Sequence, residues 1–327
     1  MVAMPLRVGA SLTLFSLACV MTSPPVSAQD KFPSRPIEVI LPVPPGGGTD
    51  IALRQLIELL EPDLGQKIVP VNKPGASGAL GMTAMVQSKP DGHTLGAIWN
   101  APLTMTPHIQ NVPYGPQDYV AVALMTSAPL VMCTKPDFPA NDGKALIEEL
   151  RRNPNRYTYG TDGAGATVHL ASERIFQKFG IKARAVPFTG AGETLKSILG
   201  GHIDIYGGAI STIQSHAQAG AVKCLLLTSK EKNAAVPQAT SLTELGVPEL
   251  ATYVWHGILA PKGTPPDRVA ILEAAFVKAI KTDKFREFMQ ARGAKAEGLG
   301  SAEFRKLIDS ENKAMGDVAA SLGMARK

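Results

Sequence analysis

The chain has 327 residues, of which 45% are hydrophobic and 19% are charged. These values are typical of a soluble globular protein with room for two ordinary domains. The formal net charge of +5 favours small anions as partners. Clustered Lys and Arg residues of the kind that bind nucleic acid are missing from the sequence, so we expect no nucleic-acid partner.

The N-terminal segment has the pattern of a secretory signal peptide. Arg7 is followed by an apolar stretch over 8–21 and then by Val26-Ser-Ala28. A basic start, an apolar core too short to span a membrane and a small-residue exit favour export, with residues 1–28 removed by cleavage after Ala28. Lipoprotein processing at Cys19 is the alternative. We therefore expect an exported protein.

One plan occurs twice along the chain: an apolar strand, a Gly-rich turn, a Thr and an amphipathic helix. A strand over 37–43 leads through Gly46-Gly-Gly48 to Thr49, and Tyr157-Thr-Tyr-Gly leads through Gly163-Ala-Gly165 to Thr167. A Gly-rich turn before a helix leaves backbone N–H groups free, and the helix dipole adds partial positive charge. Each copy therefore predicts an anion site without a charged side chain. Together they suggest a small anion held between two lobes.

The remaining segments alternate between strands and helices. We expect strands over 68–71, 94–99, 182–187, 202–207 and 222–228, and helices over 80–87, 142–152, 193–199 and 212–219. This alternation predicts an α/β fold with mostly parallel sheets. The tail after Asp267 has a helical pattern and no strands of its own, so we expect it to cover the sheet of the first lobe.

The return of the tail to the first lobe implies two crossings between the lobes, near 125–133 and 250–258. Two crossings form a hinge on which lobes can close over a ligand. We place lobe one at 29–128 and 256–327 and lobe two at 129–255. Tyr253 and Trp255 either line the cleft or fill the second crossing.

The sequence contains no motif for a cofactor or for catalysis. Gly48 is followed by Thr49-Asp50 and not by the Lys of a P-loop, and neither Gly-rich turn has the third Gly of a dinucleotide fingerprint. The six His residues are scattered, and a Gly-x-Ser-x-Gly nucleophile turn is missing. We therefore expect a binding protein with no cofactor and no metal, and not an enzyme.

Two cysteines follow the signal segment, Cys133 and Cys224, each in an apolar strand-like run. We interpret them as buried free thiols in preference to a disulfide. Two cysteines without paired His spacing also exclude a zinc framework.

Four polar side chains have competing interpretations. Asp50 and Asp162 are interpreted as residues that organise the turns, because a carboxylate facing an anion would repel it. His169 either supports its loop, which we favour, or contacts the ligand. Asp204 stands alone in an apolar strand and must be hydrogen-bonded. Anchoring of a loop is favoured there over ligand contact.

Several motifs together resemble one family. They are Val43-Pro-Pro-Gly-Gly-Gly-Thr-Asp50, Val71-Asn-Lys-Pro-Gly-Ala-Ser-Gly78, Tyr159-Gly-Thr-Asp-Gly-Ala-Gly-Ala-Thr-Val-His-Leu-Ala171, Leu199-Gly-Gly-His-Ile-Asp204 and Ala260-Pro-Lys-Gly-Thr-Pro265. In these motifs the chain resembles the Bug (TctC-like) receptors, the periplasmic solute-binding proteins of tripartite tricarboxylate transporters. The resemblance extends over residues 31–315.

This resemblance implies a two-lobed Venus-flytrap fold, of the type II periplasmic-binding-protein kind, that holds a small carboxylate with backbone amides of both Gly-rich loops. The candidate ligand-binding residues are Pro45, Gly46, Gly47 and Thr49 in lobe one and Gly163, Ala164, Gly165, Ala166, Thr167, Gly190 and Ala191 in lobe two, with His169 and Asp204 added. The segment Ile98-Trp-Asn-Ala-Pro102 departs from the Gly- and Thr/Ser-rich segment of many members and leaves the ligand's identity open.

The expected function is capture of a small organic acid by a monomer, followed by delivery to the membrane subunits of a transporter. A ligand sensor that docks to a membrane receptor is one alternative. A secreted enzyme that uses the same cleft is another.

Overall fold

Strand β4 (Tyr119–Thr134) belongs to both lobes. Its first half pairs with β9 (Tyr253–Pro261) and β10 (Lys295–Gly300), and its second half pairs with β7 (Ile205–Ala209) and β8 (Lys223–Leu227). All four pairings are antiparallel. A single strand therefore joins the two halves of the sheet.

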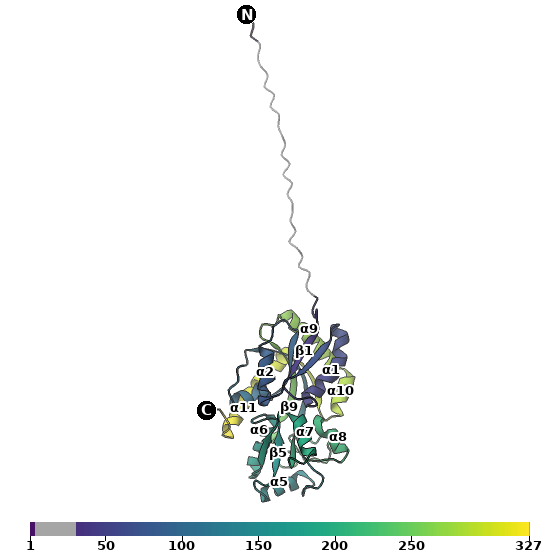
Figure 1. The fold of residues 1–327 in the computed structure, drawn as a ribbon, viewed down its shortest axis with the longest axis vertical. Coiled ribbons are helices and arrows are strands. Elements are labelled where there is room, and N and C mark those ends of the chain that lie inside the picture. The colour runs from purple at the N-terminus through teal and green to yellow at the C-terminus, as the bar shows by residue number, and fades with distance from the viewer. Residues whose placement is uncertain (4–30, 327) are drawn as a thin grey trace. The chain divides into compact units, whose positions relative to one another are not determined.

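The structure is a computed structural model that describes residues 1–3 and 31–326 (Figure 1). The predicted cleavage after Ala28 and the alternative at Cys19 lie outside the described residues. From Phe32 onward the chain forms one structural unit, and the following description concerns that unit.

The described strands form one sheet in the order β2-β1-β3-β9-β4-β7-β5-β6, with β8 and β10 also paired to β4. The bounds of the remaining strands are β1 (Ile37–Leu41), β2 (Ile68–Asn72), β3 (Thr94–Trp99), β5 (Thr158–Thr161) and β6 (Arg184–Pro187). β1 pairs in parallel with β2 and β3, and β5 pairs in parallel with β6 and β7. Lobe one is the part built on β2, β1, β3, β9 and the first half of β4. Lobe two is the part built on β7, β5, β6 and the second half of β4.

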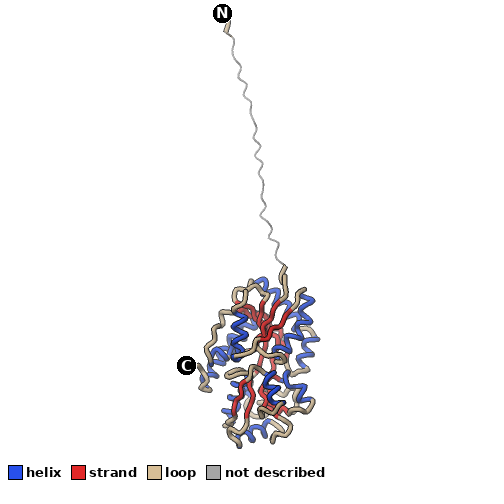
Figure 2. Tube along the Cα trace, viewed as in Figure 1, coloured by secondary structure: helices blue, strands red, loops and turns tan. Residues whose placement is uncertain are grey.

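Helices lie on both sides of the strands (Figure 2). They are α1 (Gly48–Leu64), α2 (Ala79–Val86), α3 (Ala101–Thr104), α4 (Thr106–Ile109), α5 (Gly143–Arg152), α6 (Thr167–Phe179), α7 (Ala191–Leu199), α8 (Ile210–Gln218), α9 (Pro266–Ile280), α10 (Asp283–Gln290) and α11 (Ser301–Ser321), with 3-10 turns η1 (Ala76–Gly78) and η2 (Pro248–Leu250). In Figure 1, α1 and α10 lie on one side of β1 and α2 lies on the other. Within the described residues, no helix combines the length and apolar character needed to cross a bilayer.

Helix α1 illustrates how the sequence sets these elements. Ala52, Leu56 and Leu60 recur at helical spacing and are fully buried. Gly65 ends the helix in the left-handed conformation, with φ 64°. Its N–H donates to the carbonyl of Glu61 at 2.9 Å.

The C-terminal helices cover lobe one, as predicted. Phe276 of α9 and Phe285 of α10 share an apolar cluster with Leu56 of α1. Phe304 of α11 shares another cluster with Ile98 of β3. The tail therefore completes the core of the first half of the sheet.

The expectation that this tail contains no strand is wrong. β10 pairs with β4 from Lys295, opposite Ser127, to Gly300, opposite Ala123. Its sequence contains two glycines and no β-branched residue, and Gly298 has φ 67°. Strand propensity is weak there, so the segment becomes a strand because β4 offers an edge to pair with.

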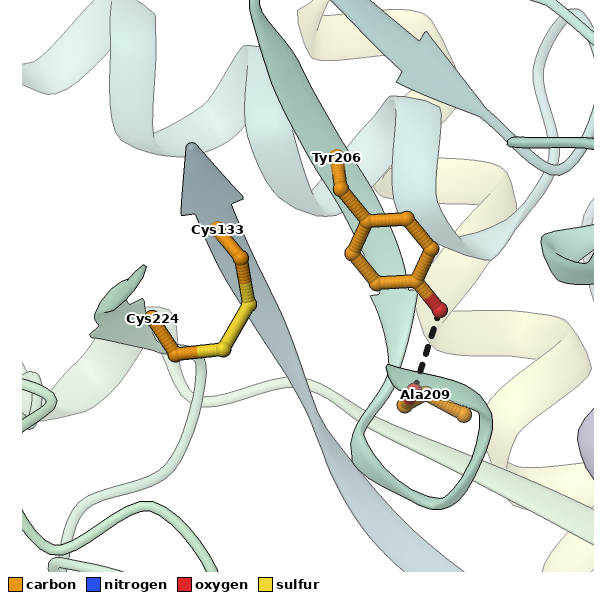
Figure 3. Close-up of a disulfide and its surroundings, with 4 residues drawn as sticks. All are labelled: Cys133, Tyr206, Ala209 and Cys224. Carbon is orange, nitrogen blue, oxygen red and sulfur yellow. Dashed lines mark hydrogen bonds between the residues drawn. A yellow bond between two sulfur atoms is a disulfide. The ribbon is translucent and has the colours of Figure 1, made fainter. Parts of the chain in front are cut away.

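Cys133 of β4 and Cys224 of β8 form a disulfide, so the prediction of two free thiols is wrong (Figure 3). The two cysteines lie directly opposite each other on antiparallel strands, and both are fully buried. They are 91 residues apart, and no local pattern reveals that their strands are neighbours. A disulfide is typical of proteins that leave the reducing cytosol.

Candidate ligand-binding site

The turn before α1 is held in shape by Asp50. The N–H of Gly46 and Nε of Arg54 donate to Asp50 Oδ2 at 3.0 and 2.9 Å, and Asn72 Nδ2 donates to Oδ1 at 3.1 Å. Burial raises the pKa of Asp50, but the hydrogen bonds outweigh burial and leave this pKa below its ordinary value. Asp50 therefore organises the turn, as the sequence suggested.

Asp162 organises the turn before α6. Its Oδ1 accepts the N–H of Val168 at 3.0 Å, and the side chain is buried. Burial raises the pKa of Asp162 to about 7, and the Val168 hydrogen bond offsets only part of that rise. The carboxyl is consequently divided between its neutral and ionised forms near pH ~7.

His169 supports the same turn. Its Nδ1 accepts the N–H of Gly165 at 2.8 Å. Burial lowers the pKa of His169, which keeps the ring neutral and Nδ1 free to accept. This is the supporting role favoured from the sequence, although the partner is an N–H group and not a carbonyl. The N–H of Gly165 is thereby engaged within the turn, and the N–H of Ala166 is bonded to the carbonyl of Gly163 at 3.2 Å.

The turn over 163–167 packs against lobe one. Ser77 Oγ donates to the carbonyl of Ala164 at 3.1 Å, and Thr167 Oγ1 donates to Asn100 Oδ1 at 2.8 Å. The sequence analysis did not single out Ser77 or Asn100, because their partners lie far along the chain. The lobes are therefore in contact, and the structure is a closed form.

This close approach requires glycine at two positions of the turn. A Cβ on Gly163 would lie 2.5 Å from Ser77 Oγ, and a Cβ on Gly165 would lie 2.4 Å from Ile109 Cδ1. Both glycines also have positive φ values, 135° and 70°. The second Gly-rich turn thus serves contact between the lobes.

A cavity of about 40 Å³ lies between the lobes. It is lined by Val43, Gly47, Gly48, Thr49, Trp99, Leu130, Asp162, Val168, Gly190, Ala191, Gly208, Ala209, Val254 and His256. Four residues of the predicted set are among them: Gly47, Thr49, Gly190 and Ala191.

The other predicted residues lie around the cavity and not on its wall. Pro45 and Gly46 are exposed at the tip of the first turn, and the turn over 163–167 faces Ser77 and Asn100 instead. The two loops still touch, because a Cβ on Gly190 would lie 3.1 Å from Pro44 Cδ.

Asp204 lies away from this cavity. Its Oδ2 accepts the N–H of Thr158 at 2.7 Å and the hydroxyl of Thr158 at 2.8 Å. Thr158 is the first residue of β5, whereas the Gly-rich turn follows the last residue of that strand. Asp204 therefore anchors the start of a strand, which is the kind of role that the sequence favoured for it over ligand contact.

His256 lines the cavity although the sequence analysis did not predict it as a site residue. Its Nδ1 shares a hydrogen bond with Thr126 Oγ1 at 2.9 Å, and Nε2 would lie 3.3 Å from a Cβ on Gly48. Burial lowers the pKa of His256 to about 4, so the imidazole is neutral near pH ~7. The one signal in the sequence was a polar residue inside an apolar strand.

Trp99 also lines the cavity; it lies in the segment over 98–102 that the resemblance associated with the ligand's identity, but it was not among the predicted ligand contacts. It ends β3, directly opposite His256 of β9. The indole is 3% exposed, and its Nε1 has no hydrogen-bond partner among the described residues. Trp255, by contrast, donates its Nε1–H to Glu311 and packs edge-on against Phe304, so it fills the crossing and not the cleft.

The cavity offers hydrogen-bond donors without a cation. No Lys or Arg occurs among the described residues that line it. Helices α1 and α7 begin at its wall, with Gly48 and Ala191 as their first residues. The N–H groups of a first helical turn lack intrahelical partners, and the helix dipole adds partial positive charge. Such a site suits a small anionic group such as a carboxylate.

Comparisons with known proteins agree with this arrangement. Residues 52–324 match the family model described as the tripartite tricarboxylate transporter family receptor, TctC. The chain is also 32% identical to the protein BugT of Bordetella pertussis over 273 residues, which cover 83% of each chain.

Solved structures with the same fold include a periplasmic transporter, BugD and MatC. The periplasmic transporter has a TM-score of 0.87 at 32% sequence identity, and the match covers 90% of this chain and 99% of the transporter chain. BugD, a periplasmic binding protein, has a TM-score of 0.84 at 25% identity, with 90% and 100% covered. MatC from Rhodopseudomonas palustris, solved with bound malate, has a TM-score of 0.82 at 26% identity, with 88% and 99% covered.

Proposed function

The chain belongs to the TctC family of receptors for tripartite tricarboxylate transporters, and from this premise we propose that it captures a small carboxylate in the periplasm. We further propose that the mature chain begins after Ala28, acts as a monomer and delivers its ligand to the membrane subunits of such a transporter. The malate bound to MatC supports a carboxylate as the ligand class. The role is that of a receptor and not of an enzyme.

One observation carries the proposal: a cavity at the start of two helices, one from each lobe, with no Lys or Arg among the described residues of its wall. We assign ligand contact to Gly47, Thr49, Gly190 and Ala191. Each charge-assisted hydrogen bond contributes about 1.5–3 kcal/mol, so useful affinity needs donors from both lobes.

We assign the turn over 163–167 to lobe contact. Its bonds with Ser77 and Asn100 exist only when the lobes meet. Lobe one is proposed to comprise 29–128 and 256–327, and lobe two 129–255, with the hinge where β4 and β9 pass between them. Ligand enters the open form and stabilises the closed form.

The test is a binding screen of seven acids: acetate, propionate, lactate, succinate, malate, adipate and benzoate. We expect at least one acid to bind by calorimetry and to raise the melting temperature. At a ligand concentration about 100 times Kd the stabilisation amounts to about 2.7 kcal/mol.

Two variants make this screen specific to the cavity. Gly48→Val would fill it, because even a Cβ at this position lies 3.2 Å from His256 Cε1, and we expect binding to be lost. Ala302→Val adds a branched side chain at an exposed position in the first turn of α11 and is expected to bind as the unaltered protein does. Melting of the unliganded variants shows whether each is folded. If none of the seven acids binds, or if Gly48→Val binds as well as Ala302→Val, the proposed function is wrong.

A further inference from the structure

Trp99 and Asp162 both line the cavity, and they come from opposite lobes. Trp99 is the last residue of β3 in lobe one, and Asp162 follows β5 in lobe two. The indole N–H lowers the pKa of Asp162, so the two groups lie near each other. Even so, the N–H has no hydrogen bond within the described part of the chain. A buried donor without an acceptor is costly, by about 1–3 kcal/mol, and requires an explanation.

The orientation of the Trp99 indole is fixed by its packing. A Cβ on Gly78 would lie 2.5 Å from Cη2 and 2.9 Å from Cζ3 of the indole, so the six-membered ring fills the space beside that glycine. Gly78 has φ 86°, a conformation that glycine adopts readily. The edge of the indole that carries Nε1 is therefore left to face Asp162 and the cavity.

The Asp162 carboxyl already has backbone donors, because the N–H groups of Val168, of Asp162 itself and of His169 all lower its pKa. Its Oδ1 takes the N–H of Val168 at 3.0 Å. The titratable groups nearest to it are the neutral His256 on the same cavity wall and Tyr206, whose hydroxyl donates to the carbonyl of Ala209 at 3.0 Å (Figure 3). No Lys or Arg lines the cavity among the described residues, so no cation neutralises Asp162 from within it.

A group that pairs with Trp99 and with Asp162 in both protonation states of Asp162 must accept one hydrogen bond and donate another. A carboxylate oxygen can only accept, so it pairs with both groups only while Asp162 is protonated and is repelled once Asp162 is ionised. An ammonium group can only donate, and it would leave the Trp99 N–H unpaired. A hydroxyl does both. It can accept from Trp99 Nε1 while it donates to Asp162.

We propose that the ligand is a hydroxycarboxylate, with its carboxylate at the helix starts of α1 and α7 and its hydroxyl between Trp99 and Asp162. This inference rests on the proposed function and adds the chemical class of the ligand to it. Trp99 and Asp162 are then the residues that set specificity. A site built to hydrogen-bond a ligand hydroxyl discriminates strongly against the analogue without it, because its buried polar groups are left unpaired.

The test compares acids that differ only in one hydroxyl. Calorimetry is carried out with L- and D-malate against succinate and with L- and D-lactate against propionate. For at least one pair we expect the hydroxy acid to bind about fivefold tighter or more, which corresponds to about 1 kcal/mol from one satisfied polar contact. If the paired acids bind equally, an ordered water already bridges the two residues and the inference is overturned.

Two variants assign the preference to this pair of residues. Trp99→Phe removes the indole N–H and keeps an aromatic ring. Asp162→Asn keeps one side-chain oxygen, which can still accept the N–H of Val168. The other oxygen, which would accept from the ligand hydroxyl, is replaced by an NH₂ group that can only donate. We expect the affinity ratio of each pair to fall to about threefold or less in both variants, because one of the two hydrogen bonds is lost. Retained binding of succinate or propionate shows that the variants are folded.

Trp255→Phe is the matched control, because its indole N–H serves Glu311 and does not face the cavity. The affinity ratio should remain as in the unaltered protein. If both Trp99→Phe and Asp162→Asn kept the affinity ratio between hydroxy acid and parent acid of the unaltered protein, the inference would be overturned, whereas carboxylate capture would stand. If these four acids fail to bind while another acid of the seven binds, the inference is overturned and carboxylate capture stands, whereas failure of all seven acids counts against the proposed function itself.

Discussion

The hydroxyl of Thr167 donates to Asn100 Oδ1 at 2.8 Å, and this bond joins lobe two to lobe one. The side-chain amide of Asn100 is itself fixed within lobe one, because its Nδ2 donates to Glu311 Oε1 at 2.8 Å. Glu311 lies on α11 and also accepts from Thr104 and Trp255. The C-terminal helix thereby fixes the amide that receives lobe two on closure.

We expect Thr167→Val to weaken ligand binding about fivefold, since a hydrogen bond of this kind contributes about 1 kcal/mol and exists only in the closed form. The loss should appear mainly as faster dissociation, which stopped-flow fluorescence measures. Thr83→Val is the control, because the Thr83 hydroxyl bonds to the carbonyl of Ala79 within α2. Unchanged dissociation in Thr167→Val would show that this bond does not stabilise closure.

Asp162 makes stability depend on pH. Burial raises its pKa from 3.8 to about 7, so the folded state holds this proton more tightly than the unfolded state does. The resulting stabilisation is fully present below the unfolded pKa and is lost as the pH rises through the folded pKa, by on the order of 4 kcal/mol in total. We therefore expect Asp162→Asn to gain stability relative to the unaltered protein between about pH 4 and about pH 8.

Chemical denaturation across this range checks the prediction. His256 changes the pH dependence of stability in the opposite direction to Asp162. Because the pKa of His256 is lowered to about 4 in the folded state, its contribution to stability is lost as the pH falls from 6.5 through about 4. Both proteins contain His256, so its contribution cancels in the difference between them. A difference that does not change with pH would mean that Asp162 is ionised throughout.

The disulfide between Cys133 and Cys224 closes a segment of the chain with a sequence separation of 91 residues. In the chain-entropy account a loop of this size stabilises the folded state by about 4–5 kcal/mol. We expect the Cys133→Ala, Cys224→Ala double variant to lose stability of this order in urea denaturation. The unaltered protein should lose the same stability when its disulfide is reduced under unfolding conditions. If the urea midpoint of unfolding were the same with and without reductant, the disulfide would be contradicted.

The sequence indicated the Gly-rich turns correctly because their signals are local. Gly46, Gly163 and Gly165 all have positive φ, a conformation that glycine adopts readily and that these turns use. Asp50, Asp162 and His169 lie within a few residues of the N–H groups that they bind, so their supporting roles could also be inferred.

The cavity wall could not be inferred in the same way. Trp99 and His256 face it because β3 and β9 pair in one particular register, which depends on chain segments far apart in sequence. The contact of the second turn with Ser77 and Asn100 likewise exists only once the lobes have closed. Prediction from local pattern therefore assigned the whole turn over 163–167 to the ligand, whereas the structure places it against lobe one.

Closure itself is the last prediction. The bonds from Ser77 to Ala164 and from Thr167 to Asn100 cross the cleft, and so does the contact of Pro44 with Gly190. Without a ligand these few contacts must offset the desolvation of the polar N–H groups and the loss of freedom of the lobes that closure brings. A carboxylate that binds donors of both lobes adds free energy to the closed form alone, which is what shifts such an equilibrium.

Small-angle X-ray scattering with saturating malate or succinate should therefore show a smaller radius of gyration than the unliganded protein. Gly48→Val, which cannot admit the acid, should keep the unliganded radius of gyration under the same conditions, whereas the radius of Ala302→Val should decrease.

The Gly46→Val, Gly47→Val double variant tests the first turn separately, because Gly46 has φ 84° and a branched side chain strains that conformation. We expect the double variant to remain folded, because a Cβ on Gly47 would lie 3.5 Å or more from its neighbours. We also expect its radius of gyration to fall only at higher acid concentrations. If calorimetry shows binding to the unaltered protein while its radius stays constant, the acid enters lobes that are already closed, and binding by closure must be abandoned.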